Sequence, residues 1–191
     1  LLPARSSSWL AAISLLGGAA DAEEAELALA FADISTGETG VIDLGLARLG
    51  DELARLQPAE LLLGAALRDR LVAARVALPA DTAPSLLPDA AFDSLAGADA
   101  IRAAFAGAVD PTAFSRAGRA ALGALIAYVA DSQKGAPLAL RPPHTEALAA
   151  YMAIDAATRA SLELLTTRDG AARGSLRHDV DCCTTAQGSR L

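Results

Sequence analysis

The stretch from Leu27 to Glu38 constrains the fold of this chain more than any other part of the sequence. It reads Leu-Ala-Leu-Ala-Phe-Ala-Asp-Ile-Ser-Thr-Gly-Glu. In an extended strand, the Leu and Phe side chains share one face and the Ala side chains share the other, so both faces are apolar. Such a strand has to be covered on both sides, and its alanine face leaves room for a helix to approach closely. We therefore predict a central strand that ends at Asp33.

A helix is the alternative interpretation of residues 23–34, because Ala and Leu are strong helix formers. The residues that follow argue against it. Residues 35–40 read Ser-Thr-Gly-Glu-Thr-Gly, which is typical of a turn. The next apolar run, Val41 to Leu44, is short, β-branched and close enough to pair as a hairpin.

The segments around this hairpin predict a mixed sheet. Residues 9–16 form a short apolar run that ends at two glycines and is typical of a strand. Residues 46–56 carry leucines at helical spacing, and Pro58 ends that helix. Residues 60–64 then predict a buried strand. Because a strand, a helix and a strand form a crossover unit, this last strand is expected to run parallel to Val41–Leu44 with right-handed topology, as a parallel addition to the hairpin.

The middle of the chain is less regular. Its patterns predict a short helix at 67–75, a strand at 76–78 and a proline-containing loop to about 92. A helix capped by Asp93 or Ser94 and a long helix starting at Asp110-Pro111 and ending near 134–135 follow. Beyond Arg141-Pro142-Pro143 the strand signals largely stop. We therefore expect two domains, residues 1–140 and residues 141–191. In the second, Asp155 caps a helix from 156 to about 165, Ser175 caps a short helix, and Thr184 or Thr185 opens a third.

Composition excludes several classes of protein. The net charge of −7 opposes autonomous nucleic-acid binding, because phosphates attract basic surfaces. No apolar run approaches the roughly 18 to 20 residues that cross a bilayer, and no secretory signal opens the chain. The two cysteines, Cys182 and Cys183, are adjacent and cannot staple distant segments, so the cytoplasm is the expected compartment. The chain does not start with Met, and we expect both ends to be cut from a longer protein.

Several stretches, taken together and in order, resemble the MutS family of DNA mismatch repair proteins. They are Trp9-Leu-Ala-Ala-Ile13, Leu29-Ala-Phe-Ala-Asp-Ile-Ser-Thr-Gly-Glu38, Pro58-Ala-Glu-Leu-Leu62, Ala124-Leu-Ile-Ala-Tyr128, Met152-Ala-Ile-Asp-Ala-Ala-Thr-Arg-Ala-Ser-Leu-Glu-Leu164 and Gly174-Ser-Leu176. The set covers nearly the whole chain. The chain departs from the family pattern at Asp181-Cys182-Cys183, where Asp-Arg-Thr is usual, and at His178-Asp179, which replaces an apolar pair.

The resemblance implies a place within that family. Residues 1–140 look like the connector domain, with a ribonuclease-H-like mixed sheet flanked by helices, and residues 141–191 look like the start of the helical core, or lever, domain. The connector would couple mismatch recognition to the ATPase and could dock MutL on residues 46–110. The parent protein would bind mismatched DNA, ATP and Mg²⁺ and would be a homodimer, whereas this chain alone is expected to be a monomer. The chain has no Gly-x-x-x-x-Gly-Lys-[Ser/Thr] phosphate loop, so we expect no cofactor and no ATPase activity in it.

Two groups of residues are candidate chemical sites. Asp33, Glu38 and Asp43 are the acids nearest the hairpin, and clustered carboxylates hold metal ions in ribonuclease-H-like nucleases, but no spacing forces these three together. His178 and Cys182 are four residues apart, with Asp179, Asp181 and Cys183 nearby; a closed zinc site needs four ligands, and no second pair exists. We assign no catalytic, cofactor-binding or metal-binding residue. Two other hypotheses stay open: a stand-alone metal-dependent nuclease that uses Asp33, and a small acidic adaptor without a repair role.

Overall fold

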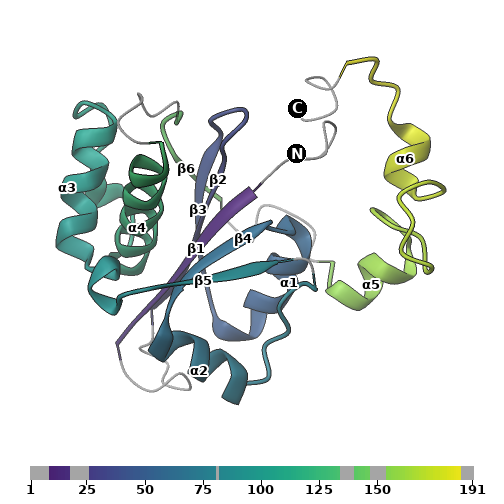
Figure 1. Cartoon of the computed structure of the whole chain (residues 1–191), viewed down its shortest axis with the longest axis horizontal. Coiled ribbons are helices and arrows are strands. Elements are labelled where there is room, and N and C mark those ends of the chain that lie inside the picture. Colours follow the sequence, from purple (N-terminus) through teal and green to yellow (C-terminus); the bar gives the residue numbers. More distant parts are fainter. Residues whose placement is uncertain (1–8, 18–25, 81, 134–139, 147–153, 186–191) are drawn as a thin grey trace. The chain divides into compact units, whose positions relative to one another are not determined.

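The computed structural model describes residues 9–17, 26–80, 82–133, 140–146 and 154–185. The chain divides into two compact units. The first, residues 8–151, holds a six-stranded sheet with helices on both faces and is called the sheet unit below. The second consists of residues 1–7 and 152–191, and its described part contains short helices. The expected α/β fold with a mixed sheet and a short helical segment is confirmed (Figure 1).

The sheet has the strand order β5-β4-β1-β2-β3-β6. The strands are β1 (Trp9–Leu16), β2 (Glu26–Asp33), β3 (Thr39–Leu44), β4 (Glu60–Gly64), β5 (Ala83–Leu87) and β6 (His144–Thr145). Strand β2 pairs antiparallel with β1 and with β3, so it is central and forms the expected hairpin with β3. The pairs β1–β4, β4–β5 and β3–β6 are parallel.

The two apolar faces of β2 are covered by different helices. Its alanines, Ala28, Ala30 and Ala32, are fully buried on the face covered by α4 (Arg116–Ser132), and α3 (Ser94–Ala104) packs against α4. Its larger side chains, including Leu29 and Phe31, pack with α1 (Leu46–Leu56) and α2 (Ala65–Ala73). Figure 1 shows these helix pairs on opposite sides of the sheet. The prediction that the alanine face admits a closely packed helix is confirmed.

Strand β4 runs parallel to β3, as the crossover unit predicts. It lies on the other side of the hairpin, where it pairs with β1, with Leu10 opposite Glu60 and Ala12 opposite Leu62. This position satisfies β1: because Leu10 to Ile13 are buried, the backbone N–H and C=O groups at both edges of β1 need strand partners in place of water. Strand β3 carries the exposed Asp43 and lies next to the two-residue strand β6, close to the sheet edge.

The prediction of a strand at 76–78 is wrong. The edge strand of the sheet is β5, which lies in the region predicted to be a proline-containing loop. Strand β5 contains Pro84, which pairs with Leu61. The Ala83 amide donates to the Ala59 carbonyl, so alternation along the strand turns Pro84, which has no N–H, away from β4. An edge strand tolerates proline at such a position.

The helix that follows β5 is close to expectation, and the next one starts later than expected. Asp93 caps α3 by accepting from the amides of Leu95 and Ala96. Asp110 and Pro111 open only a short 3₁₀ turn, η2 (Pro111–Ala113), and Phe114 is extended. Ser115 is the true N-cap of α4, because its hydroxyl accepts from the Gly118 amide. The expected end of this helix at 134–135 falls outside the described residues, and α4 ends at Ser132.

The expected division into a domain of residues 1–140 and a domain of residues 141–191 stays a prediction. In this chain the sheet unit continues to residue 151 and includes β6. In the second unit, α5 (Ala156–Ser161) is capped by Asp155 and α6 (Leu176–Val180) by Ser175, as expected, although α5 ends four residues before Leu165. Most of the third expected helix falls outside the described residues. No described helix is both long enough and apolar enough to cross a bilayer.

Helices α3 and α4 cross at a pair of glycines. A Cβ atom on Gly123 would overlap the backbone of Gly97, and one on Gly97 would overlap the Arg119 carbonyl. Neither neighbour is a flexible side chain that could move aside. The two helix backbones therefore touch, and this contact holds α3 against the helix that covers the alanine face of β2.

We predict that Gly123→Ala destabilises the chain by about 1–3 kcal/mol, because the added methyl forces the two helices apart. Gly50→Ala is the matched control. Gly50 also lies inside a helix, but its Cβ would meet only the Ala77 carbonyl at 3.9 Å, so the change is expected to stabilise by roughly 0.5–1 kcal/mol. Urea unfolding of both variants measures the difference. Equal effects at the two glycines would contradict the close crossing.

Candidate functional site

The three acids near the hairpin do not converge. Asp33 is buried at the end of β2, where its carboxylate accepts from the Ser35 amide at 2.8 Å and the Ser35 hydroxyl at 2.6 Å. Glu38 is exposed in the turn. Asp43 pairs with Ala28 of β2. Ala28 is five residues from Asp33, so at ~3.4 Å per residue the backbones of Asp43 and Asp33 are separated by roughly 17 Å along the sheet. Asp33 stabilises the turn between β2 and β3, and the nuclease hypothesis gains no support.

Asp43 has a different role that the sequence did not suggest. Its carboxylate accepts from the Ser115 hydroxyl at 2.5 Å. Because Ser115 also caps α4, this contact joins the end of β3 to the start of the helix that covers β2.

His178 and Cys182 do not share a helical face. Helix α6 ends at Val180, and Asp181 is extended, so Cys182 lies beyond the helix. The His178 ring faces its neighbour Asp179 at 3.2 Å, and Cys182 and Cys183 are free and exposed. Among the described residues, no group of three or more potential ligands lies close enough together to hold a metal ion.

A polar contact joins α4 to two strands. The carboxylate of Glu60 on β4 accepts from the hydroxyl of Tyr128 on α4 and from the hydroxyl of Ser85 on β5, both at 2.5 Å. The hydrogen bond to Glu60 raises the pKa of Tyr128 above its ordinary value near 10, and burial acts in the same direction. Two of the motifs that carry the family resemblance, at 58–62 and 124–128, are thus in direct contact.

A second polar contact fixes the last strand of the sheet unit. Arg55 on α1 pairs with Glu52 at 2.7 Å and with Glu146 at 2.8 Å. The Glu146 amide donates to the Val41 carbonyl, and the Arg141 amide donates to the Gly37 carbonyl. The two backbone hydrogen bonds lie on either side of β6 in the sequence. The Arg55–Glu146 pair attaches this end of the sheet unit to α1.

An aromatic group closes the same end of the sheet. The rings of Trp9 and Phe31 meet edge to face at 5.4 Å between centroids, and those of Phe31 and His144 at 5.9 Å. The Phe31 ring also covers Gly40, where a Cβ would overlap it. His144 therefore contributes an aromatic contact that supports β6.

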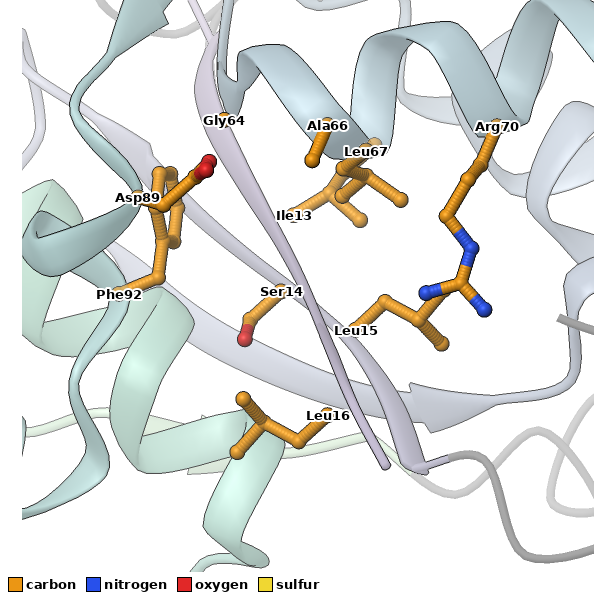
Figure 2. A pocket seen from close by; sticks show the side chains of 10 residues that line it. All are labelled: Ile13, Ser14, Leu15, Leu16, Gly64, Ala66, Leu67, Arg70, Asp89 and Phe92. Atoms are coloured by element: carbon orange, nitrogen blue, oxygen red, sulfur yellow. The ribbon is translucent and has the colours of Figure 1, made fainter. Parts of the chain in front are cut away.

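A cavity lies at the opposite end of the sheet from Asp33. Its volume is about 200 Å³, and its lining includes residues 13–16 of β1, the start of α2, and the 3₁₀ turn η1 (Asp89–Phe92) (Figure 2). Ser14 is among the lining residues and is 2% exposed, and its hydroxyl oxygen is buried without a hydrogen-bond partner among the described residues. A buried hydroxyl without a partner costs about 1–3 kcal/mol. Sequence reasoning missed this site, because a single serine in an apolar strand gives no periodic signal.

Comparisons with known proteins agree with this geometry. Residues 8–146 match the model of MutS domain II, and this span covers β1 to β6. The chain belongs to the MutS family. The DNA mismatch repair proteins MutS of Rhodopseudomonas palustris (strain HaA2) and Paracoccus denitrificans are 39% and 41% identical to it over 201 and 195 residues. Each alignment covers all of this chain but 21% of the relative, so the chain spans about a fifth of these MutS proteins.

The resemblance stated from the sequence motifs is therefore confirmed, and the sheet unit is MutS domain II, the connector. The Glu60–Tyr128 contact and the attachment of β6 are features of this domain. The assignment of residues 141–191 to the MutS core domain is not tested by the domain II match, which ends at residue 146.

We predict that the Glu60–Tyr128 contact makes stability fall at alkaline pH. Because the folded-state pKa of Tyr128 is raised, its contribution to stability is complete below pH 10, the unfolded pKa, and is lost as the pH rises through the folded value. Urea unfolding between pH 8 and 11.5 should show a smaller alkaline loss for Tyr128→Phe than for the parent chain. Identical pH profiles would show that the hydrogen bond does not form in solution.

Proposed function

We propose that this chain serves as the connector through which a MutS protein couples mismatch recognition to ATP-driven rearrangement. Membership in MutS domain II supports this role most directly. The attachment of β6 supports it as well, because the sheet unit holds the chain at Glu146 immediately before the segment that leads to the second unit. DNA binding, ATP hydrolysis and dimerisation belong, in this proposal, to the parent protein, and the chain itself performs no bond-making chemistry.

The Arg55–Glu146 pair is the contact that this proposal uses. Both side chains are largely shielded, with 31% and 18% of their surfaces exposed. Removal of the guanidinium leaves Glu52 and Glu146 without their shared partner, and shielded carboxylates without a partner are costly. The strand β6 has two residues and two paired positions, so it depends strongly on this support.

We predict that Arg55→Leu in the full-length parent weakens coupling and leaves mismatch binding intact. The measurement is the rate at which ATP releases the protein from mismatched DNA, which should fall about five- to tenfold, whereas affinity without ATP should change little. Arg68→Leu is the matched control, because Arg68 pairs with the neighbouring Asp69 on the exposed surface of α2. An unchanged release rate in Arg55→Leu would contradict the role given to β6.

We also propose that MutL docks on the outer surface of residues 46–110. Large apolar side chains exposed in this range include Val72 on α2, Leu86 on β5 and Leu95 on α3, with 70%, 46% and 76% of their surfaces accessible. Buried apolar side chains are frequent anchors in protein interfaces. Val72 and Leu95 lie on helices that cover opposite faces of the sheet, so each of the three is a separate candidate anchor.

We expect that at least one of Val72→Asp, Leu86→Asp and Leu95→Asp lowers MutL affinity tenfold or more in the full-length parent, because a buried unpaired charge opposes docking. Surface plasmon resonance with immobilised MutL measures this affinity. Ile34→Asp is the control, since Ile34 is 40% exposed but lies outside the range. MutL binding unaffected by all three changes would place the docking surface elsewhere.

A further inference from the structure

Two adjacent thiols follow the end of α6. The helix ends at Val180, Asp181 is extended, and Cys182 and Cys183 come next in the chain. Neither cysteine is in a disulfide, and both are exposed. They lie in the second unit, so none of the contacts that carry the coupling and MutL proposals involves them. What these thiols can bind is therefore a separate question.

The backbone turns at the two cysteines. The Cys183 amide donates to the Asp181 carboxylate at 2.9 Å, and this hydrogen bond closes an Asx turn with Cys182 at its centre. In a continued helix, adjacent side chains would project about 100° apart around the axis, and in a straight strand they would point to opposite faces. A turn imposes neither restriction. Rotation of the two side chains about their Cα–Cβ bonds can therefore bring both sulfurs to one atom.

The two sulfurs are poorly placed to bond with each other. The peptide bond between the cysteines is trans, which keeps adjacent Cα atoms about 3.8 Å apart. Disulfide-bonded cysteines usually have Cα atoms ~4.4–6.8 Å apart, and departures from that range store strain and make the bond easier to reduce. An atom inserted between the sulfurs lengthens the bridge and relieves this strain. The adjacent thiols thus favour a bridging atom over a bond between themselves.

The number of available ligands decides which atom fits. A structural zinc ion takes four protein ligands, and the part of the chain that the structure describes places no group of three or more potential ligands together. Thiolate sulfur is a soft ligand and selects soft acceptors. Trivalent arsenic with one organic substituent forms two further bonds to sulfur and needs no other protein ligand. Two adjacent thiols therefore complete its coordination.

We propose that Cys182 and Cys183 form a binding site for a monosubstituted trivalent arsenical, with both sulfurs bonded to the same arsenic atom. When the arsenical is an arsine oxide, two As–S bonds replace the arsenic–oxygen double bond. The oxygen takes both thiol protons and leaves as water. Arsenic stays trivalent and neither sulfur is oxidised, so the step needs no oxidant or reductant.

The site does not require thiols that lack other contacts. Cys183 takes part in a further interaction within the chain. Hydrogen bonds of a thiol are weak, because S–H is a weak donor and sulfur is a weak acceptor. The formation of a covalent As–S bond outweighs the loss of such a contact.

Chelation distinguishes this site from a single cysteine. Once one sulfur has bonded to arsenic, the other lies one residue away, so the second bond forms within the same molecule. Linking two binding groups in this way raises affinity by about 10²–10⁴-fold over one group. The site is therefore expected to retain the arsenical against a monothiol such as glutathione and to release it to a small dithiol.

The test is titration of the reduced 191-residue chain with phenylarsine oxide. Mass spectrometry of the intact protein is expected to show one phenylarsenic group per chain, and a thiol assay is expected to show that both thiols are lost together. Excess glutathione should leave the adduct in place, whereas dimercaptopropanol should remove it. Cys182→Ser and Cys183→Ser should each lower the glutathione concentration that removes half of the adduct by about a hundredfold or more.

A variant with separated thiols is the matched control. Cys183→Ser combined with Ala96→Cys keeps two exposed positions for cysteine, one of them on α3 in the sheet unit. This variant should lose the arsenical to glutathione as readily as Cys183→Ser alone, and far-UV circular dichroism checks that each variant is folded. The inference is overturned if the parent chain retains the arsenical no better than the single-cysteine variants, or if the separated thiols retain it equally well.

Discussion

The sheet unit depends on the close approach of α4 to the alanine face of β2. Small residues on both partners, Ala28, Ala30 and Ala32 on the strand and Ala117, Ala120 and Ala121 on the helix, are buried together and leave little space between the two backbones. This approach determines where the ends of α4 lie. At its start Ser115 reaches Asp43, and near its end Tyr128 reaches Glu60. The polar contacts between helix and sheet therefore follow from the small side chains between them.

Local patterns in the sequence were sufficient for the elements whose periodicity is strong. The bounds of β1, β2, α1 and β4 agree with expectation to within one residue, and β3 starts two residues before its expected start, because each element shows its pattern within its own residues. The neighbour of β4 could not be predicted in this way, since it depends on which other strand needs a partner on both sides. Strand β5 was missed because Pro84 argues against a strand until its edge position is known.

The features of functional interest were less accessible to sequence reasoning, because they depend on residues that are far apart in the chain. Arg55 and Glu146 are 91 residues apart, and neither belongs to a recognisable motif. Ser14 is one small polar residue in an apolar strand, and only the end of β4 beside it creates the cavity. The family resemblance, in contrast, rested on ordered motifs along the chain, and the match to MutS domain II bears it out. Its motifs at 58–62 and 124–128 correspond to a contact in space.

The pairing of β6 with β3 also bears on the order in which the domain assembles. His144 lies beside Gly40, more than a hundred residues earlier in the chain. The hairpin and the β1–β4 pair require only short or intermediate loops, so their contacts can form early, whereas closing the β3–β6 loop carries the largest entropic cost. During synthesis from the N-terminus, the sheet can form from β1 to β5 before β6 has emerged. The last strand then acts as a closing step, and chains that stop short of Glu146 would lack it.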